Sequence, residues 1–224
     1  MREAYQSDLR HLVDDLVDMA SMVRTALEDA TTALLESDLV LAERVIAADP
    51  HIDERQVDLD SKIVELLARQ SPVATDLRLM VAALRMSSSL ERMGDLSAHI
   101  ALAARRSHPE SAVPVQHREQ IARMGELAAT AVQEAAVVIA ERDLALAARV
   151  ENNDDQLDEL QREIAREIAR SEGFSNAQIV DMTLLIRFYE RLGDHAVSLV
   201  RRVGFLVTGD SVDTLNSATD VEEF

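Results

Sequence analysis

The segment ESDLVLAERV at residues 36–45 returns as ERDLALAARV at residues 141–150, with seven of the ten positions identical. At the same offset along the chain, Asp49 falls on Asp154 and Asp53 falls on Asp158. A repeat of about a hundred residues is too long for one solenoid unit and indicates a duplicated domain. The 224 residues therefore divide into two similar halves.

Apolar residues recur at helical spacing along both halves, as at Leu9, Leu12, Leu16, Met19 and Val23. Only 3% of the residues are aromatic, and four Pro and six Gly leave room for long uninterrupted helices. The pattern predicts an all-α fold of two tandem, pseudo-symmetric three-helix bundles, whose antiparallel helices are each about 45 Å long. The predicted units are residues 1–108 and 115–208, separated by a polar stretch with two prolines. An acidic tail follows at residues 209–224.

Several helix ends are predicted from capping residues. Ser37 or Asp38 is expected to cap the second helix, and Ser175 the sixth. Ser71 is expected to cap the third helix, with Pro72 at its first position, where a missing N–H does no harm.

The composition excludes several classes of function. A formal charge of −18 repels phosphate backbones, so we expect no binding to nucleic acid and instead expect cations or basic surfaces as partners. The absence of cysteine excludes disulfides, thiolate metal sites and cysteine nucleophiles. Neither a signal peptide nor a membrane span is visible, which predicts a cytoplasmic protein.

Pairs of acidic residues one helical turn apart recur at repeat-equivalent positions. The sequence ERMGD occupies residues 91–95, and ERLGD occupies residues 190–194. With 41 acids in the chain, about seven such pairs are expected by chance, so a single pair carries no weight. Duplication makes eight carboxylates candidate metal ligands: Asp49, Asp53, Glu91 and Asp95 in one half, and Asp154, Asp158, Glu190 and Asp194 in the other.

A cation would explain why like charges are kept one turn apart, because such pairs destabilise a helix by a few tenths of a kcal/mol. Carboxylates from two helices form an oxygen cage suited to Mg²⁺, Mn²⁺, Ca²⁺ or iron. Gly94 and Gly193 precede the last acid of each pair, and a helical glycine at this point twice indicates close packing or a site. The alternative is that Arg92 and Arg191 pair with the acids as ordinary packing salt bridges.

The histidines are weaker candidates. His51 and His195 lie beside the acids, but their repeat partners are Gln156 and Leu96, so surface imidazoles are the better interpretation. No Glu-x-x-His, HExxH, GxSxG or phosphate-cradling glycine loop occurs, and the sequence therefore shows no catalytic apparatus.

Residues 71–100 and 186–203, with their TDLR and paired ER-x-GD motifs, resemble the PhoU family of phosphate-transport accessory and regulatory proteins. The chain is closest in appearance to the actinobacterial PhoY branch, and the resemblance covers residues 1–208. It implies two tandem three-helix bundles in a cytoplasmic homodimer that represses the phosphate-starvation response when phosphate is plentiful. The implied partners are the sensor histidine kinase and the ATPase of the phosphate ABC transporter, so membrane association would come through partners.

In some members of the family the acidic pairs are ligands of multinuclear metal clusters. Carried over, the resemblance assigns the eight acids above to two clusters, with iron, Mn, Mg or Zn as the candidate metals. Pro50 and His51 lie within the first cluster's DPHID segment and have no counterpart in the second, so equal occupancy of the two sites is not expected.

Three interpretations of function follow. The first is a non-enzymatic adaptor that relays the transporter's state to the kinase and so lowers high-affinity phosphate uptake. The alternative, from another class, is a carboxylate-bridged multinuclear metalloprotein with enzymatic activity. The third is a helical bundle whose acidic pairs only solvate its surface.

Overall fold

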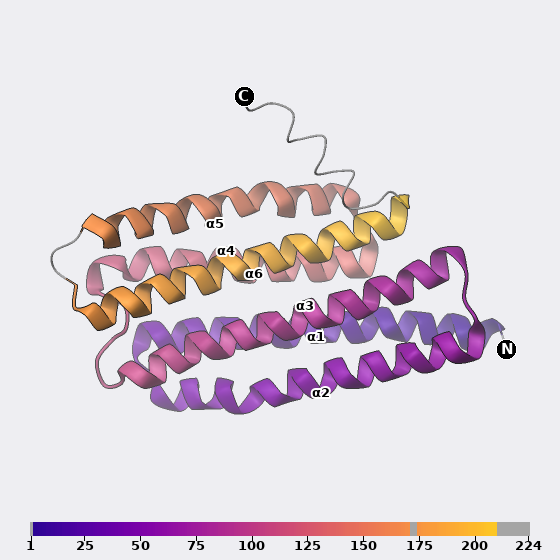
Figure 1. Ribbon diagram of the computed structural model, residues 1–224, viewed down its shortest axis with the longest axis horizontal. Coiled ribbons are helices and arrows are strands. Elements are labelled where there is room, and N and C mark those ends of the chain that lie inside the picture. The colour runs from indigo at the N-terminus through magenta and orange to yellow at the C-terminus, as the bar shows by residue number, and fades with distance from the viewer. Residues whose placement is uncertain (1, 171–173, 210–224) are drawn as a thin grey trace, which may run out of the picture.

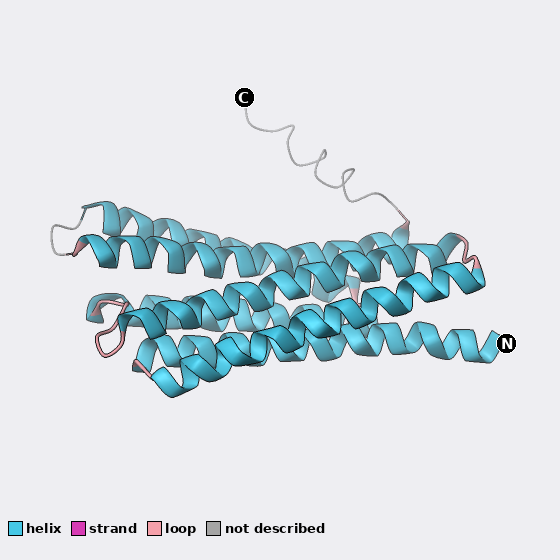
Figure 2. Ribbon diagram, turned by 60° about the horizontal axis from the view of Figure 1, so that its bottom comes forward, coloured by secondary structure: helices cyan, strands magenta, loops and turns pink. Residues whose placement is uncertain are grey.

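The computed structural model describes residues 2–170 and 174–209, and in these residues the chain forms six long α-helices (Figure 1). They are α1 (Arg2–Glu36), α2 (Leu39–Gln70), α3 (Ala74–Ser107), α4 (Arg118–Glu141), α5 (Leu144–Arg170) and α6 (Asn176–Thr208). A short 3₁₀ turn, η1 (Val115–His117), precedes α4. No strand occurs in the described residues (Figure 2), and the all-α prediction is confirmed.

The helix ends test the predicted caps. Asp38 caps α2, because its Oδ1 accepts a hydrogen bond from a backbone N–H of the first turn at 3.0 Å. Ser175 caps α6 in a reciprocal capping box with Gln178. The predictions for Ser71 and Pro72 are wrong: Ser71 ends α2 in the left-handed conformation, with φ 46°, and α3 begins only at Ala74. Pro72 cannot continue the helix that precedes it, and it disfavours the α conformation for Ser71, so the chain turns there before α3 begins.

The helices group into two sets of three. Helices α1, α2 and α3 pack against one another, and α4, α5 and α6 do the same. The sets meet along α1 against α4 and α3 against α6, with α2 and α5 at opposite edges (Figure 1). One buried apolar cluster runs through both sets, and the domain limits at residues 108 and 115 remain a prediction. Of the predicted tail at 209–224, only Gly209 lies in the described residues, where it ends α6.

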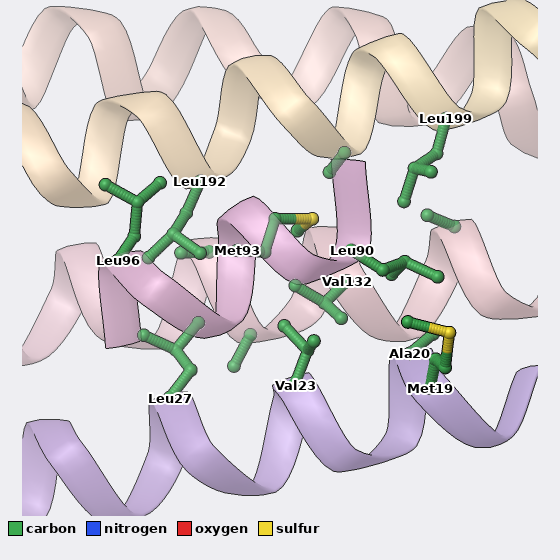
Figure 3. Close-up of a cluster of buried hydrophobic side chains, with 14 of the residues drawn as sticks. Met19, Ala20, Val23, Leu27, Leu90, Met93, Leu96, Val132, Leu192 and Leu199 are labelled. Carbon is green, nitrogen blue, oxygen red and sulfur yellow. The ribbon is translucent and has the colours of Figure 1, made fainter. Parts of the chain in front are cut away.

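The core fixes the rotation of α3, the helix that carries one acidic pair. Figure 3 shows Leu90 and Met93 of α3 among side chains from α1 and α6, including Leu27 and Leu192. All four are fully buried, and burying each such side chain contributes about 1.5–3 kcal/mol. Because residues 90 and 93 point inward, Glu91 and Asp95 are turned toward α2 and the solvent, each partly exposed.

A buried hydroxyl also joins the two sets. Tyr189 of α6 is fully buried, and its hydroxyl shares a hydrogen bond of 2.9 Å with Oγ1 of Thr31 in α1. Thr31 Oγ1 also donates to the carbonyl oxygen of Leu27 at 2.8 Å. The phenol is therefore satisfied in the core, as a buried polar group must be.

Candidate metal centres

The first acidic cluster lies between α2 and α3. Asp49, Asp53 and Asp95 each offer a carboxylate oxygen, and these three atoms lie within 4.8 Å of one another. Glu91 belongs to the same cluster, because its charge interacts with all three. The four acids that sequence reasoning grouped in the first half are thus brought together by two facing helices.

The second acidic cluster lies between α5 and α6. Asp154 interacts electrostatically with Asp158, Asp194 and Glu190, which places the four acids of the second half around one point. Among the described residues, only the first cluster brings three ligand atoms within 4.8 Å, so the second is more open. Unequal occupancy of the two sites by metal stays a prediction.

Ion pairs lie at the edges of both clusters. In the second cluster Asp158 Oδ2 accepts from Arg162 at 3.0 Å, and Glu190 is paired with Arg187. In the first cluster Arg92 donates to Asp95 Oδ2 at 2.8 Å. Arg92 therefore pairs as the salt-bridge alternative expected. In the second half, Arg162 and Arg187 take that role, and Arg191 forms no ion pair with a described residue.

Gly94 and Gly193 each allow the neighbouring helix of their cluster to pack closely. A Cβ at Gly94 would lie 3.0 Å from Cδ1 of Ile52 and 3.4 Å from an oxygen of Asp49. A Cβ at Gly193 would lie 2.7 Å from Cδ2 of Leu157 and would also collide with Asp154. The bare backbone of α3 or α6 thus makes room for an apolar side chain and the first aspartate of the neighbouring helix. Sequence reasoning singled out the glycines but not Ile52 and Leu157, although these two are also repeat-equivalent.

The ion pairs at the edges compensate only part of the negative charge of the clusters. Burial, and then the neighbouring carboxylates, raise the pKa of Asp49 and of Asp154, which reaches about 6. Burial and the adjacent aspartate likewise raise the pKa of Glu91 and Glu190. Oε2 of Glu190 is buried without a hydrogen-bond partner. Each cluster therefore attracts either protons or a cation.

The donor atoms suit a hard metal ion. Each cluster offers four carboxylates in the described residues, and such oxygen sets bind Mg²⁺, Mn²⁺, Ca²⁺ or ferric iron rather than soft ions. The unpartnered oxygen of Glu190 and the close triad of the first cluster are features that a bound cation would satisfy. The residues present therefore fit the metal ions that the sequence suggested.

The histidines near the acidic clusters differ in their burial. His51 is exposed and within 3.3 Å of Glu54, as expected for a surface imidazole. His195 is half-buried, and burial with neighbouring Arg191 lowers its pKa. Sequence reasoning missed His99, whose ring lies 5.4 Å from that of Phe188 and whose charge lowers the pKa of Asp49. The signal was available, because His99 follows Asp95 by one helical turn.

The fold and these clusters define a class: an all-α protein of two similar three-helix units, each carrying one cluster of four carboxylates. The family model described as PhoU domain matches the chain twice, at residues 16–104 and 121–203. The chain belongs to the PhoU family.

Curated relatives and solved structures of the PhoU family also match the chain along most of its length. The chain is 41% identical over 210 residues to phosphate-specific transport system accessory protein PhoU homolog 1 of Mycobacterium leprae, covering 93% of this chain and 95% of that protein. Homolog 2 of Mycobacterium tuberculosis is also 41% identical, covering 93% and 99%. The crystal structure of PhoU from Pseudomonas aeruginosa superposes with a TM-score of 0.84 at 27% identity, covering 92% and 100%. The phosphate transport system regulatory protein PhoU from Streptococcus pneumoniae gives 0.83 at 25%, covering 92% and 98%.

The resemblance to the PhoU family is therefore confirmed, as is the likeness to its actinobacterial members. Among the described residues, no helix combines the length and the apolar character that crossing a membrane requires.

Proposed function

We propose that this chain is an accessory protein of phosphate-specific transport that represses the phosphate-starvation response while phosphate is plentiful. In this proposal it joins the ATPase of the phosphate ABC transporter to a sensor histidine kinase, on the cytoplasmic side and as a homodimer. The observation that carries the proposal is identity of 41% along 93% of the chain to a protein named as such an accessory protein. The lack of a catalytic motif in the sequence supports an adaptor over an enzyme.

We also propose that the two acidic clusters hold metal ions. The ligands would be Asp49, Asp53, Glu91 and Asp95 in the first cluster, and Asp154, Asp158, Glu190 and Asp194 in the second. A bound cation supplies the positive charge that these carboxylates lack. The chain's own residues orient the carboxylates, because Gly94 and Gly193 bring the neighbouring helices close. Each cluster joins the outer helix of one set to the helix in contact with the other set, so a bound metal ion would stabilise the packing of these two helices.

The regulatory role is tested in a strain that lacks this gene and any paralogue, grown with excess phosphate. We expect a constitutively high transcript of the high-affinity phosphate transporter, restored to a low level by the wild-type gene. An unchanged transcript would remove the proposed role and would favour the metalloenzyme alternative.

The metal proposal is tested on the purified chain with Asp49→Asn combined with Asp95→Asn. The matched control is Asp58→Asn, an exposed acid on α2 outside the cluster. Elemental analysis after incubation with Mn²⁺ and removal of excess metal should show less bound metal in the double variant than in the control. Equal metal content in both would contradict the assignment of these ligands.

A further inference from the structure

A stretch of the seam between α3 and α6 contains no acidic residue, although Asp76 precedes it in the first turn of α3. Residues 77–90 of α3 and residues 195–208 of α6 contain neither Asp nor Glu, in a chain with 41 acids. Arg78, Arg85 and Arg202 lie in these stretches, and we refer to them as the arginine row. This stretch of the seam is therefore cationic, although the chain as a whole carries a charge of −18.

The three arginines follow one line because α3 and α6 run antiparallel along the seam. Arg85 is opposite Arg202, and their repulsion adds to burial in lowering the pKa of Arg202. Arg78 is opposite Gly209, since a Cβ on that glycine would lie 3.4 Å from Arg78 Nη1. Arg78 and Arg85 are seven residues apart, which is two helical turns or about 10 Å on the same side of α3. The row thus begins where α6 ends.

The arginine row has no carboxylate partner among the described residues, although Arg78 Nη2 donates a hydrogen bond to Thr75 Oγ1 at 3.2 Å. None of its three members forms an ion pair there, whereas Arg92, the next arginine along α3, is bonded to Asp95 at 2.8 Å. The Nε atoms of Arg78 and Arg202 are buried without a hydrogen-bond partner. Guanidinium groups pair most strongly with carboxylates, so the row is suited to an acidic segment.

The sequence supplies such a segment directly after Gly209. Residues 210–224 contain five acids and no Lys, Arg or His. The acids are Asp210, Asp213, Asp220, Glu222 and Glu223. Fifteen residues span at most about 50 Å when extended, several times the length of the row.

We propose that residues 210–224 lie along the arginine row, with their carboxylates paired to its guanidinium groups. The segment then covers the acid-free stretch of the α3–α6 seam, and a partner with an acidic segment of its own competes for the same row. The proposal rests on charge, on unpaired donors and on where α6 ends. It does not depend on the role in phosphate transport.

The absence of cysteine from the chain allows a direct test by spin labelling. Nitroxide labels are attached to the full-length chain at Ser88→Cys, an exposed position on α3, and at Ser217→Cys. Double electron–electron resonance then measures the distance distribution between the labels, with labelled chain diluted into excess unlabelled chain. We expect a narrow distribution at low salt. Substituting Arg78, Arg85 and Arg202 together by Gln should widen it at least about two-fold, toward that of a free coil.

Two further samples complete the test. Arg105→Gln, an exposed arginine near the other end of α3, should leave the width unchanged. About 1 M NaCl should widen the distribution of the chain with an intact row, because the Debye length falls to about 3 Å. Equal widths with the row intact or substituted, together with no effect of salt, would overturn the proposal. A short distance seen only without dilution would also overturn it, because the segment would then reach another copy.

Discussion

Removing the charge of Asp154 should stabilise the metal-free protein. Its carboxyl pKa is raised from 3.8 to about 6 by burial, by the three other acids of its cluster and, least, by Asp155. A difference of 1 in pKa corresponds to about 1.36 kcal/mol. The raised pKa of Asp154 therefore corresponds to a loss of stability of at most about 3 kcal/mol. The side chain is only half-buried, so screening by solvent reduces the expected gain for Asp154→Asn to about 1–1.5 kcal/mol at neutral pH.

The pH dependence of the gain shows whether it comes from removing an ionised carboxylate. A carboxyl whose pKa is higher in the folded than in the unfolded chain takes up protons on folding, so its contribution to stability falls as pH rises from about 4 to 6. Above that window the penalty at Asp154 is complete, and below it the penalty is absent. The gain from Asp154→Asn should therefore be near zero at about pH 4 and largest above pH 6.

The measurement is urea unfolding in EDTA, followed by circular dichroism, at pH values on both sides of this window. Asp58→Asn is the matched control, because it removes the same charge from an exposed acid on α2 outside both clusters and should change stability by less than about 0.5 kcal/mol. A loss of stability for Asp154→Asn that is equal at both pH values would show that the carboxylate is already compensated. The reasoning about an incompletely compensated cluster would then fail.

Four further changes test the packing and the clusters. Gly193→Ala should destabilise the protein by about 1–3 kcal/mol in thermal or urea unfolding, because its Cβ would meet Leu157 and Asp154. Gly204→Ala, whose Cβ meets nothing within 4 Å, should instead stabilise it by about 0.5–1 kcal/mol, and the same sign for both would contradict the steric argument. Tyr189→Phe should cost about 1 kcal/mol of unfolding free energy by removing the hydrogen bond to Thr31, and an unchanged urea midpoint would show that this bond adds no net stability. Adding Mn²⁺ at about a hundred times its dissociation constant should stabilise the EDTA-treated chain by about 2.7 kcal/mol in differential scanning calorimetry, and no shift would count against metal binding.

Much of the fold was readable because its signals are local. Helical periodicity and the few breaks indicated six helices, and the capping residues Asp38 and Ser175 marked two of their beginnings correctly. The misplaced cap at Ser71 shows the limit of such signals. A serine before a proline can begin one helix or end another, and the choice depends on how far the preceding helix extends.

The composition of each cluster was also readable from the sequence. Acids four residues apart share one side of a helix, and the duplication placed equivalent pairs on α2 and α3 and on α5 and α6. The sequence alone therefore determined which eight carboxylates belong together, and that two glycines accompany them.

Only the tertiary structure decided how these parts meet. It placed α3 against α6, set Gly193 against Leu157, and gave Arg187 rather than Arg191 as the ion-pair partner of Glu190. These contacts depend on the rotation and register of helices that are far apart in the chain. Periodicity defines the apolar side of each helix, but the fit of side chains such as Leu90 and Leu192 in the shared core sets which helices touch and at what height.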